Sequence, residues 1–256
     1  MKEYLVLFME SPQLKVTKRI FVALPEGYHE SDEHYPVLYL HDGQNLFDDM
    51  TAHHKRSWRI LDELDGSDAP KVILVGIENG GTKRANELIP WEFKFNTLNN
   101  KGGGQADLYL DFITTTVKPY IDLRFRTFKN RKNTGIMGSS FGGVNSFYAA
   151  LKYNHVFSRF GCLSNAFFYG FYDKMKELTK ASDFHGVRRL YMDFGTNESS
   201  VDMENDDYLR TNREMFDIVK TKLDESHLRF EVIEGGKHHE RDWQKRFVDI
   251  LTYLFA

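Results

Sequence analysis

The chain has 256 residues, 41% of them hydrophobic and 14% aromatic, a composition that excludes an intrinsically disordered protein and allows a sizeable buried core. The formal net charge of -3 gives no electrostatic basis for binding nucleic acid or an anionic membrane, and no apolar run is long enough to span a bilayer. The one cysteine, Cys162, excludes an internal disulfide framework. Together with an N-terminus that lacks a secretory signal pattern, it predicts a cytoplasmic protein.

Strand-type and helix-type segments alternate along most of the chain. Strand-type patterns occur at residues 4–9, 16–24, 35–40, 72–77, 134–137, 157–163, 188–194 and 228–233. Helical spacing occurs at residues 56–64, 108–121, 144–151, 169–179, 208–223 and 240–255. This order predicts an α/β fold: a mostly parallel central sheet with helices on both faces and an antiparallel N-terminal strand pair. No linker or repeat divides the chain, so we expect one domain over residues 1–256.

Residues 78–107 interrupt this alternation. They are rich in glycine, asparagine and aromatic residues and follow neither the strand nor the helix period. We therefore expect a long loop here, of the kind that is usually functional or mobile in a compact domain.

Gly138, Ser140 and Gly142 form a Gly-x-Ser-x-Gly pattern between the strand at 134–137 and the helix at 144–151. In a strand-to-helix elbow, the central serine takes a strained backbone conformation that lifts its hydroxyl clear of the sheet edge. The two glycines keep side chains from colliding with the neighbouring strand and helix. The pattern alone is common by chance, but its position between a strand and a helix predicts that Ser140 is a nucleophile.

Two later strands end in loops whose side chains complement a serine. Glu198 follows the strand at 188–194, and His238 follows the strand at 228–233. Because ligands gather at the carboxyl ends of parallel strands, we expect these side chains to meet Ser140. An imidazole accepts the hydroxyl proton during attack, and a carboxylate fixes the tautomer of that imidazole. The chain order of serine, acid and histidine, as in α/β-hydrolases, predicts His238 as the base and Glu198 as the acid.

Both partners of Ser140 have competitors in the sequence. Asp193 lies on the strand itself, and Asp202 lies beyond the loop, where it is equally suited to cap the next helix. His238 and His239 are adjacent, so at most one of them faces the serine, and the other is solvated or caps the final helix.

An oxyanion formed during attack needs preorganised hydrogen-bond donors. One expected donor is the backbone N–H of Phe141, next to the nucleophile. The other comes from the loop after the strand at 35–40, at Gly43, or at Gln44 if the register differs by one.

The sequence gives no reason to expect a metal or another cofactor. His53-His54 lacks a third ligand at metal spacing, and the acidic run at 202–207 lacks the glycine and closing glutamate of a calcium loop. Cys162 lies in an expected buried strand, where it packs as a small hydrophobic residue.

Four motifs, in this order, resemble one known family. They are residues 35–43 (Tyr-Pro-Val-Leu-Tyr-Leu-His-Asp-Gly), 138–143, 195–198, and 235–238 followed by Trp243. The chain resembles the Putative esterase (esterase D-like) family of α/β-hydrolases. Its members include feruloyl and acetylxylan esterases, S-formylglutathione hydrolases, siderophore trilactone esterases and mycolyltransferases.

The resemblance implies an α/β-hydrolase fold with Ser140 as nucleophile, Glu198 as acid and His238 as base. His238 is favoured over His239 because its distance to Trp243 matches the family's spacing. The chain departs from the family in carrying glutamate where aspartate is commoner, and in reading His-Asp-Gly at residues 41–43 where His-Gly is commoner.

Two side chains are candidate substrate contacts. Gln44 lies in the loop that carries the second oxyanion donor. Trp91 lies in the segment 84–91, which resembles a loop near the active site of some bacterial members, and it is either a substrate wall or a core residue.

These features predict a serine carboxylesterase that acts on a small-molecule ester through an acyl-enzyme on Ser140. The expected substrate is an ester of an acetyl or aromatic acyl group, either on a carbohydrate or in a small aromatic ester. The alternatives are a siderophore trilactone esterase, an acyltransferase to an acceptor other than water, and a binding protein that keeps the fold without using the site.

Overall fold

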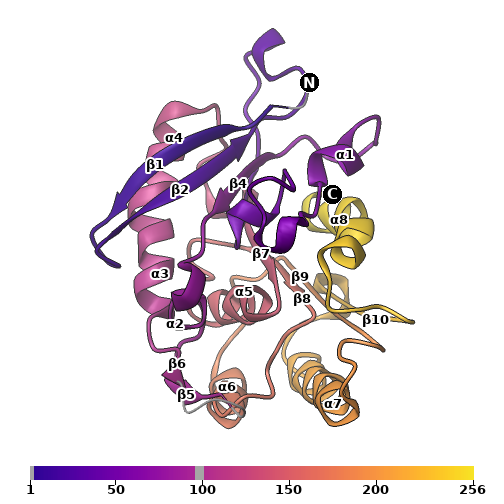
Figure 1. Ribbon diagram of the computed structural model, residues 1–256. Coiled ribbons are helices and arrows are strands. Elements are labelled where there is room, and N and C mark those ends of the chain that lie inside the picture. The colour runs from indigo at the N-terminus through magenta and orange to yellow at the C-terminus, as the bar shows by residue number, and fades with distance from the viewer. Residues whose placement is uncertain (1–2, 96–100) are drawn as a thin grey trace.

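The computed structural model describes residues 3–95 and 101–256, and within them an eight-stranded sheet runs in the order β1-β2-β4-β3-β7-β8-β9-β10 (Figure 1). The strands are β1 (Leu5–Ser11), β2 (Val16–Ala23), β3 (Val37–Leu40), β4 (Ile73–Ile77), β7 (Thr134–Ser139), β8 (Arg159–Leu163), β9 (Arg189–Gly195) and β10 (Leu228–Ile233). β2 pairs antiparallel with β1 and β4, and the pairs from β4 through β10 are parallel. The predicted α/β fold with its antiparallel N-terminal pair is therefore confirmed, and it is the α/β-hydrolase fold.

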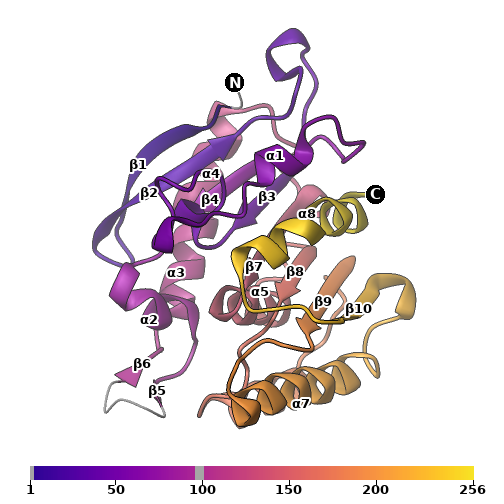
Figure 2. The ribbon, with the colours of Figure 1, turned by 45° about the vertical axis from the view of Figure 1, so that its right-hand side comes forward.

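Helices cover both faces of this sheet, as Figure 2 shows, with α1 and α8 on one side and α3, α5 and α7 on the other. The helices are α1 (Ile60–Leu64), α2 (Arg84–Leu88), α3 (Ala106–Phe112), α4 (Lys118–Arg124), α5 (Phe141–Lys152), α6 (Tyr172–Ala181), α7 (Asp202–Val219) and α8 (Glu240–Phe255). Strand β3 contributes apolar side chains to both faces of the sheet. Leu38 and Leu40 pack toward α8, and the alternate residues Val37 and Tyr39 pack toward α5.

The first predicted helix is shorter than expected. It was predicted for residues 56–64, but α1 begins at Ile60 because Arg59 has a left-handed backbone with φ 45°. The carboxylate of Asp49 accepts hydrogen bonds from the N–H of Ser57 and the side chain of Arg59, and it holds the approach to the helix in a non-helical conformation. A local helical period does not reveal such a distant contact.

Residues 78–107 are more ordered than the expected long loop. They contain the short helix α2 and a small hairpin of β5 (Phe93–Lys94) and β6 (Lys101–Gly102), while residues 96–100 of the segment lie outside the described residues. The Asn145 side-chain amide donates to the carbonyl of Leu88 at 2.8 Å and so fastens α2 to α5. Elements this short show no period in the sequence, so their stability comes from tertiary packing.

Helix α8 and strand β10 have the predicted bounds, whereas α7, expected at 208–223, begins at Asp202 and ends at Val219. The helix expected at 108–121 is a continuous helical segment of α3 and α4 joined by a π turn at Ile113–Val117. In the described part of the chain, no helix has both the length and the apolar character that crossing a bilayer requires.

Helix α5 packs closely on β8 because Gly143 has no side chain. A methyl group at this position would lie 2.7 Å from the carbonyl oxygen of Leu163 and 2.6 Å from Asn165 Oδ1. We predict that Gly143→Ala lowers the free energy of unfolding by about 1–3 kcal/mol through overpacking, as measured by chemical denaturation.

The matched control is Gly170→Ala, where the added methyl group would meet Phe93 Cβ at an ordinary 3.9 Å. It should change the free energy by no more than about 0.5 kcal/mol. Alanine is otherwise the better helix former, so a Gly143→Ala variant as stable as the wild type would contradict the close packing.

Candidate active site

Ser140 occupies the elbow between β7 and α5. Its backbone has φ 60° and ψ -126°, a strained conformation for a residue with a side chain. The N–H of Ser140 donates to the carbonyl of Leu163 at 2.9 Å, which fixes the elbow on the neighbouring strand. A methyl group on Gly138 would lie 2.7 Å from His41 Cδ2, so this tight turn depends on glycine there. The strand-to-helix elbow that the sequence predicted is present.

Ser140 and His238 line one cavity of about 790 Å3. The cavity lies at the carboxyl ends of β3, β4 and β7 and is closed on one side by the start of α8. The rest of its lining combines the polar side chains of Asp42, Gln44, Arg56, Asn79 and Arg84 with the apolar surface of Trp58 and Trp243. The side chains that the sequence proposed as nucleophile and base thus face the same space.

The carboxylate of Glu198 contacts the imidazole of His238. His238 Nδ1 lies 2.8 Å from Glu198 Oε2, and the side chain of Glu198 is fully excluded from solvent. The other oxygen, Oε1, accepts the N–H of Gly195 at 2.5 Å. Since a carboxylate only accepts, Nδ1 carries the hydrogen, and Nε2 of the neutral ring is left as the acceptor.

Two aromatic rings hold the imidazole in place. The ring of Tyr208 lies 5.1 Å from that of His238, and the ring of Trp243 meets it edge-on at 4.9 Å. The indole N–H of Trp243 donates to the hydroxyl of Ser164 at 2.9 Å. The ring of His238 is therefore oriented by packing as well as by hydrogen bonding.

The competing carboxylates have other partners. Asp193 is buried and accepts Arg246 Nε at 2.8 Å, the Tyr191 hydroxyl at 3.0 Å and the Ser164 N–H at 3.0 Å. Asp202 is exposed in the first turn of α7. Of the three acids considered from the sequence, Glu198 is the one that the structure brings to His238.

His239 begins α8 and does not take the place of His238. Its Nδ1 accepts the N–H of Arg241 at 3.0 Å, so it caps the helix, which is one of the two roles expected for the second histidine. Nε2 of His239 lies 2.7 Å from the Arg56 guanidinium at the cavity.

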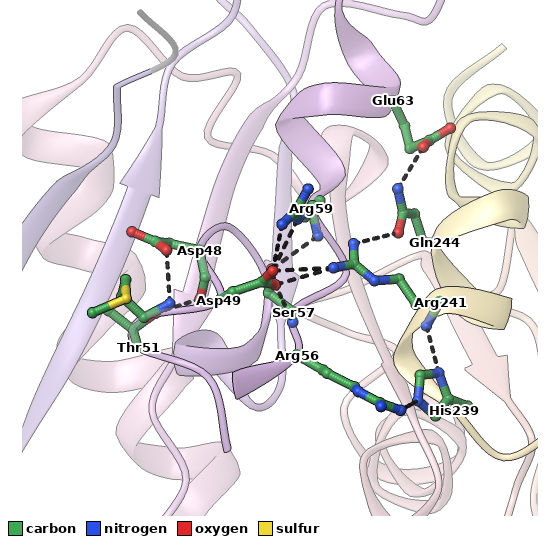
Figure 3. A network of polar contacts seen from close by, with 11 residues as sticks. Asp48, Asp49, Thr51, Arg56, Ser57, Arg59, Glu63, His239, Arg241 and Gln244 are labelled. Carbon is green, nitrogen blue, oxygen red and sulfur yellow. Dashed lines mark hydrogen bonds and ion pairs between the residues drawn. The ribbon is translucent and has the colours of Figure 1, made fainter. Parts of the chain in front are cut away.

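A network of charged side chains ties the segment before α1 to the start of α8 (Figure 3). The Asp49 carboxylate lies between the guanidinium groups of Arg59 and Arg241 and also accepts the N–H and hydroxyl of Ser57. The hydrogen bond from Arg59, followed by that from the Ser57 backbone, lowers the pKa of Asp49 well below its usual range. No local pattern in the sequence predicts this network, which fixes the chain at Arg241, three residues beyond His238.

The two expected oxyanion donors come from two segments, the start of α5 and the turn after β3. Phe141 is the first residue of α5, where the N–H groups have no partner within the helix. Gly43 begins a 3-10 turn in which Asn45 and Leu46 donate, so the turn itself does not use the N–H groups of Gly43 and Gln44. Gly43 packs against β4, since a methyl group there would lie 2.6 Å from the carbonyl carbon of Gly76.

Of the two candidate substrate contacts, Gln44 lies at the cavity and Trp91 does not. Gln44 lines the cavity, and its side-chain oxygen accepts the N–H of Asn79 at 3.2 Å. Trp91 is half-buried against Tyr148 and packs on the core, outside the described residues that line the cavity. The geometry thus favours the core position for Trp91, one of the two roles considered.

An ion pair of Asp42 and Arg84 at the cavity was not foreseen. Arg84 Nε and Nη2 donate to the two oxygens of Asp42 at 2.7 and 2.8 Å, and the Asn79 amide donates to Oδ1 at 2.5 Å. Burial alone would raise the pKa of Asp42, but Arg84 and Asn79 together outweigh it and lower that pKa. Both residues lie in segments that the resemblance placed near the site, but they are far apart in the chain and no local pattern indicates that they pair.

Within residues 3–95 and 101–256, no three His, Cys, Asp or Glu side chains are grouped as a metal site would require. The Cys162 thiol is buried in β8, and burial raises its pKa well above the usual value. The thiol is thus held in its unreactive protonated form.

Comparison with known proteins gives consistent matches over the whole fold. The family described as Putative esterase matches residues 11–254. An uncharacterized protein of Bacillus subtilis (strain 168), YbbA, is 25% identical over 245 residues, which is 93% of each chain. The structure of an IroE-like serine hydrolase from Shewanella oneidensis is 27% identical, with a TM-score of 0.75 over 99% of this chain and 80% of that one. The siderophore hydrolase EstA from Aspergillus nidulans has the same fold at 17% identity, with a TM-score of 0.76 over 100% of this chain and 96% of that one.

The charged network around Asp49 gives a prediction for stability against pH. Because pairing lowers the pKa of Asp49 in the folded protein, the folded state binds a proton less tightly than the unfolded chain. Its stabilisation is complete above the unfolded pKa of about 4 and is lost as the pH falls below that value. We predict that wild type is more stable than Asp49→Asn at pH 7 and that the difference shrinks steadily below about pH 4.

Chemical denaturation at a series of pH values measures this difference. The matched control is Asp48→Asn, which removes the adjacent carboxylate, a group that accepts the N–H of Met50. A stability difference for Asp49→Asn that stays constant down to about pH 3 would contradict the assigned ion pairs.

Proposed function

Since the chain belongs to the Putative esterase family of serine hydrolases, we propose that it is a serine carboxylesterase with Ser140, His238 and Glu198 as its catalytic triad. The observation that carries the proposal is the hydrogen bond of 2.8 Å between His238 Nδ1 and the solvent-excluded Glu198. This hydrogen bond leaves Nε2 of His238 available as a base. His238 lines the same cavity as Ser140, whose backbone is held in a strained conformation at the elbow.

In the proposed reaction, the Ser140 hydroxyl attacks the ester carbonyl while His238 Nε2 takes its proton. Glu198 stabilises the positive charge that develops on the ring. The N–H of Phe141 and that of Gly43 or Gln44 donate to the oxyanion of the tetrahedral intermediate. His238 then returns the proton to the leaving alcohol, and a water molecule that it activates releases the acid from Ser140.

The cavity supports a compact polar ester as the substrate. Its lining carries amide and charged side chains, among them Gln44, Asn79 and Arg56, which suit the hydroxyl groups of a carbohydrate or a phenol. We favour an acetyl or aromatic acyl group on such an alcohol.

A second candidate is hydrolysis of a siderophore trilactone. A cavity of about 790 Å3 is larger than an acetyl ester needs, and the siderophore hydrolase EstA has the same fold. Ranking kcat/KM for p-nitrophenyl acetate, methyl ferulate and a catecholate trilactone separates the two candidates. A trilactone rate well above the others would overturn the preferred substrate class and leave the triad intact.

We predict that Ser140→Ala lowers the turnover of p-nitrophenyl acetate by about 10,000-fold or more, because it removes the nucleophile. The matched control is Ser146→Ala on the same helix, whose buried hydroxyl has no hydrogen-bond partner among the described residues. The control should keep wild-type turnover. Equal rates for Ser140→Ala and wild type would exclude the proposed mechanism.

A second variant tests which acid completes the triad. Glu198→Gln should lower kcat by about 1,000- to 10,000-fold, since an amide no longer stabilises the imidazolium or fixes its tautomer. Asp202→Asn removes the exposed competitor and should leave kcat within about twofold of wild type. If Asp202→Asn were inactive and Glu198→Gln active, the assignment of the acid would be wrong.

A further inference from the structure

We propose that Arg84 is a positioning residue of the oxyanion hole, where it cancels the charge of Asp42 and holds together the two chain segments that carry the oxyanion donors. The inference rests on the proposed esterase function. It assigns a role to an ion pair that the triad mechanism does not use.

Asp42 poses an electrostatic problem for that mechanism. It directly precedes Gly43, and a methyl group on Gly142 in the first turn of α5 would lie only 3.4 Å from Asp42 Oδ2. A carboxylate here lies beside both segments expected to donate to the oxyanion. An uncompensated negative charge so close to these donors opposes the formation of a second one, and the effect is strengthened because Asp42 is buried.

The neighbouring imidazole does not supply the missing positive charge. Burial lowers the pKa of His41 to about 4, so the ring is neutral at pH 7. Its Nδ1 is taken by the hydroxyl of Tyr109 at 3.0 Å. The counter-charge of Asp42 is therefore the guanidinium of Arg84, which meets it with two parallel hydrogen bonds.

Arg84 also contacts the segment that carries the nucleophile. Its Nη2 lies 3.4 Å from the carbonyl oxygen of Ser139, and its guanidinium lies 5.7 Å from the ring centre of Phe141. On the other side, Asp42 has a left-handed backbone with φ 56°, a conformation that aspartate tolerates better than most residues. Arg84 and Asn79 hold its side chain and so fix the turn that presents Gly43 and Gln44.

A double-mutant cycle tests the charge compensation. Arg84→Met leaves Asp42 unpaired and should lower kcat for p-nitrophenyl acetate by about 10- to 100-fold with KM little changed. Asp42→Asn should cost less, and adding it to Arg84→Met should recover kcat at least about tenfold. Arg84→Lys keeps the charge but loses the planar fork, so its kcat should fall between those of wild type and Arg84→Met.

The matched control is Arg19→Met. Arg19, on strand β2, also donates from Nε and Nη2 to a carboxylate, here to one oxygen of Glu78. The pair lies outside the cavity lining, so loss of Arg19 should leave kcat unchanged. Comparing an ester with the corresponding thionoester supplies a second measurement. The ratio of the two rates would not change if Arg84 had a purely structural role. Sulfur is a poor acceptor for an oxyanion hole, so the ratio of the ester rate to the thionoester rate should fall in Arg84→Met and stay at the wild-type value in Arg19→Met.

Three results would overturn the inference. They are an unchanged kcat in Arg84→Met, a change confined to KM, or a lower kcat with an unchanged ester-to-thionoester ratio and no recovery in the double variant. Ser140→Ala is measured in the same assay. If wild-type turnover does not depend on Ser140, the proposed function fails and the inference with it; if it does, failure of the Arg84 tests removes the inference alone.

Discussion

The buried carboxylate of Glu198 depends on two hydrogen bonds, from the N–H of Gly195 and from the ring of His238. A charge excluded from water is tolerated only when its oxygens are paired, so this contact fixes the tautomer of His238 as well as its position. The rings of Tyr208 and Trp243 complete the support, and Trp243 is itself anchored to Ser164 at the end of β8. The cavity-facing geometry of the base thus follows from contacts made behind it.

The sheet supplies the other half of the site through the close approach of its backbone. Ser140 takes its strained conformation where Gly138 allows His41 to pack against the strand end. Charged pairs then hold the loops that surround this point: Asp42 with Arg84 on one side of the cavity, and Asp49 with Arg241 near the start of α8. The charges of Asp42 and Arg84 at the cavity are therefore paired within the protein, and His238 is paired with Glu198.

The sequence predicted the parts of the site whose conformation is local. The glycines around Ser140 and the strand-to-helix order were sufficient for the elbow, and the place of His238 after the last strand was sufficient to place it at the cavity that Ser140 lines. The sequence left three carboxylates as candidates for the acid. It does not reveal that Asp193 forms an ion pair with Arg246, a residue far along the chain. The same physical limit explains why the ion pair of Arg84 with Asp42 was not predicted and why the predicted first helix was longer than α1. Both depend on side chains that meet only after folding.

The covalent intermediate gives the most direct test of the account. The wild-type protein is mixed with p-nitrophenyl acetate, quenched in acid during the first turnover, digested and analysed by mass spectrometry. The account predicts an acetyl group on the peptide that contains residues 138–143, located on Ser140, with a longer-lived adduct in a Glu198→Gln variant. Turnover without any acetylated Ser140, or an acetyl group on another residue that appears and disappears at the rate of turnover, would contradict it.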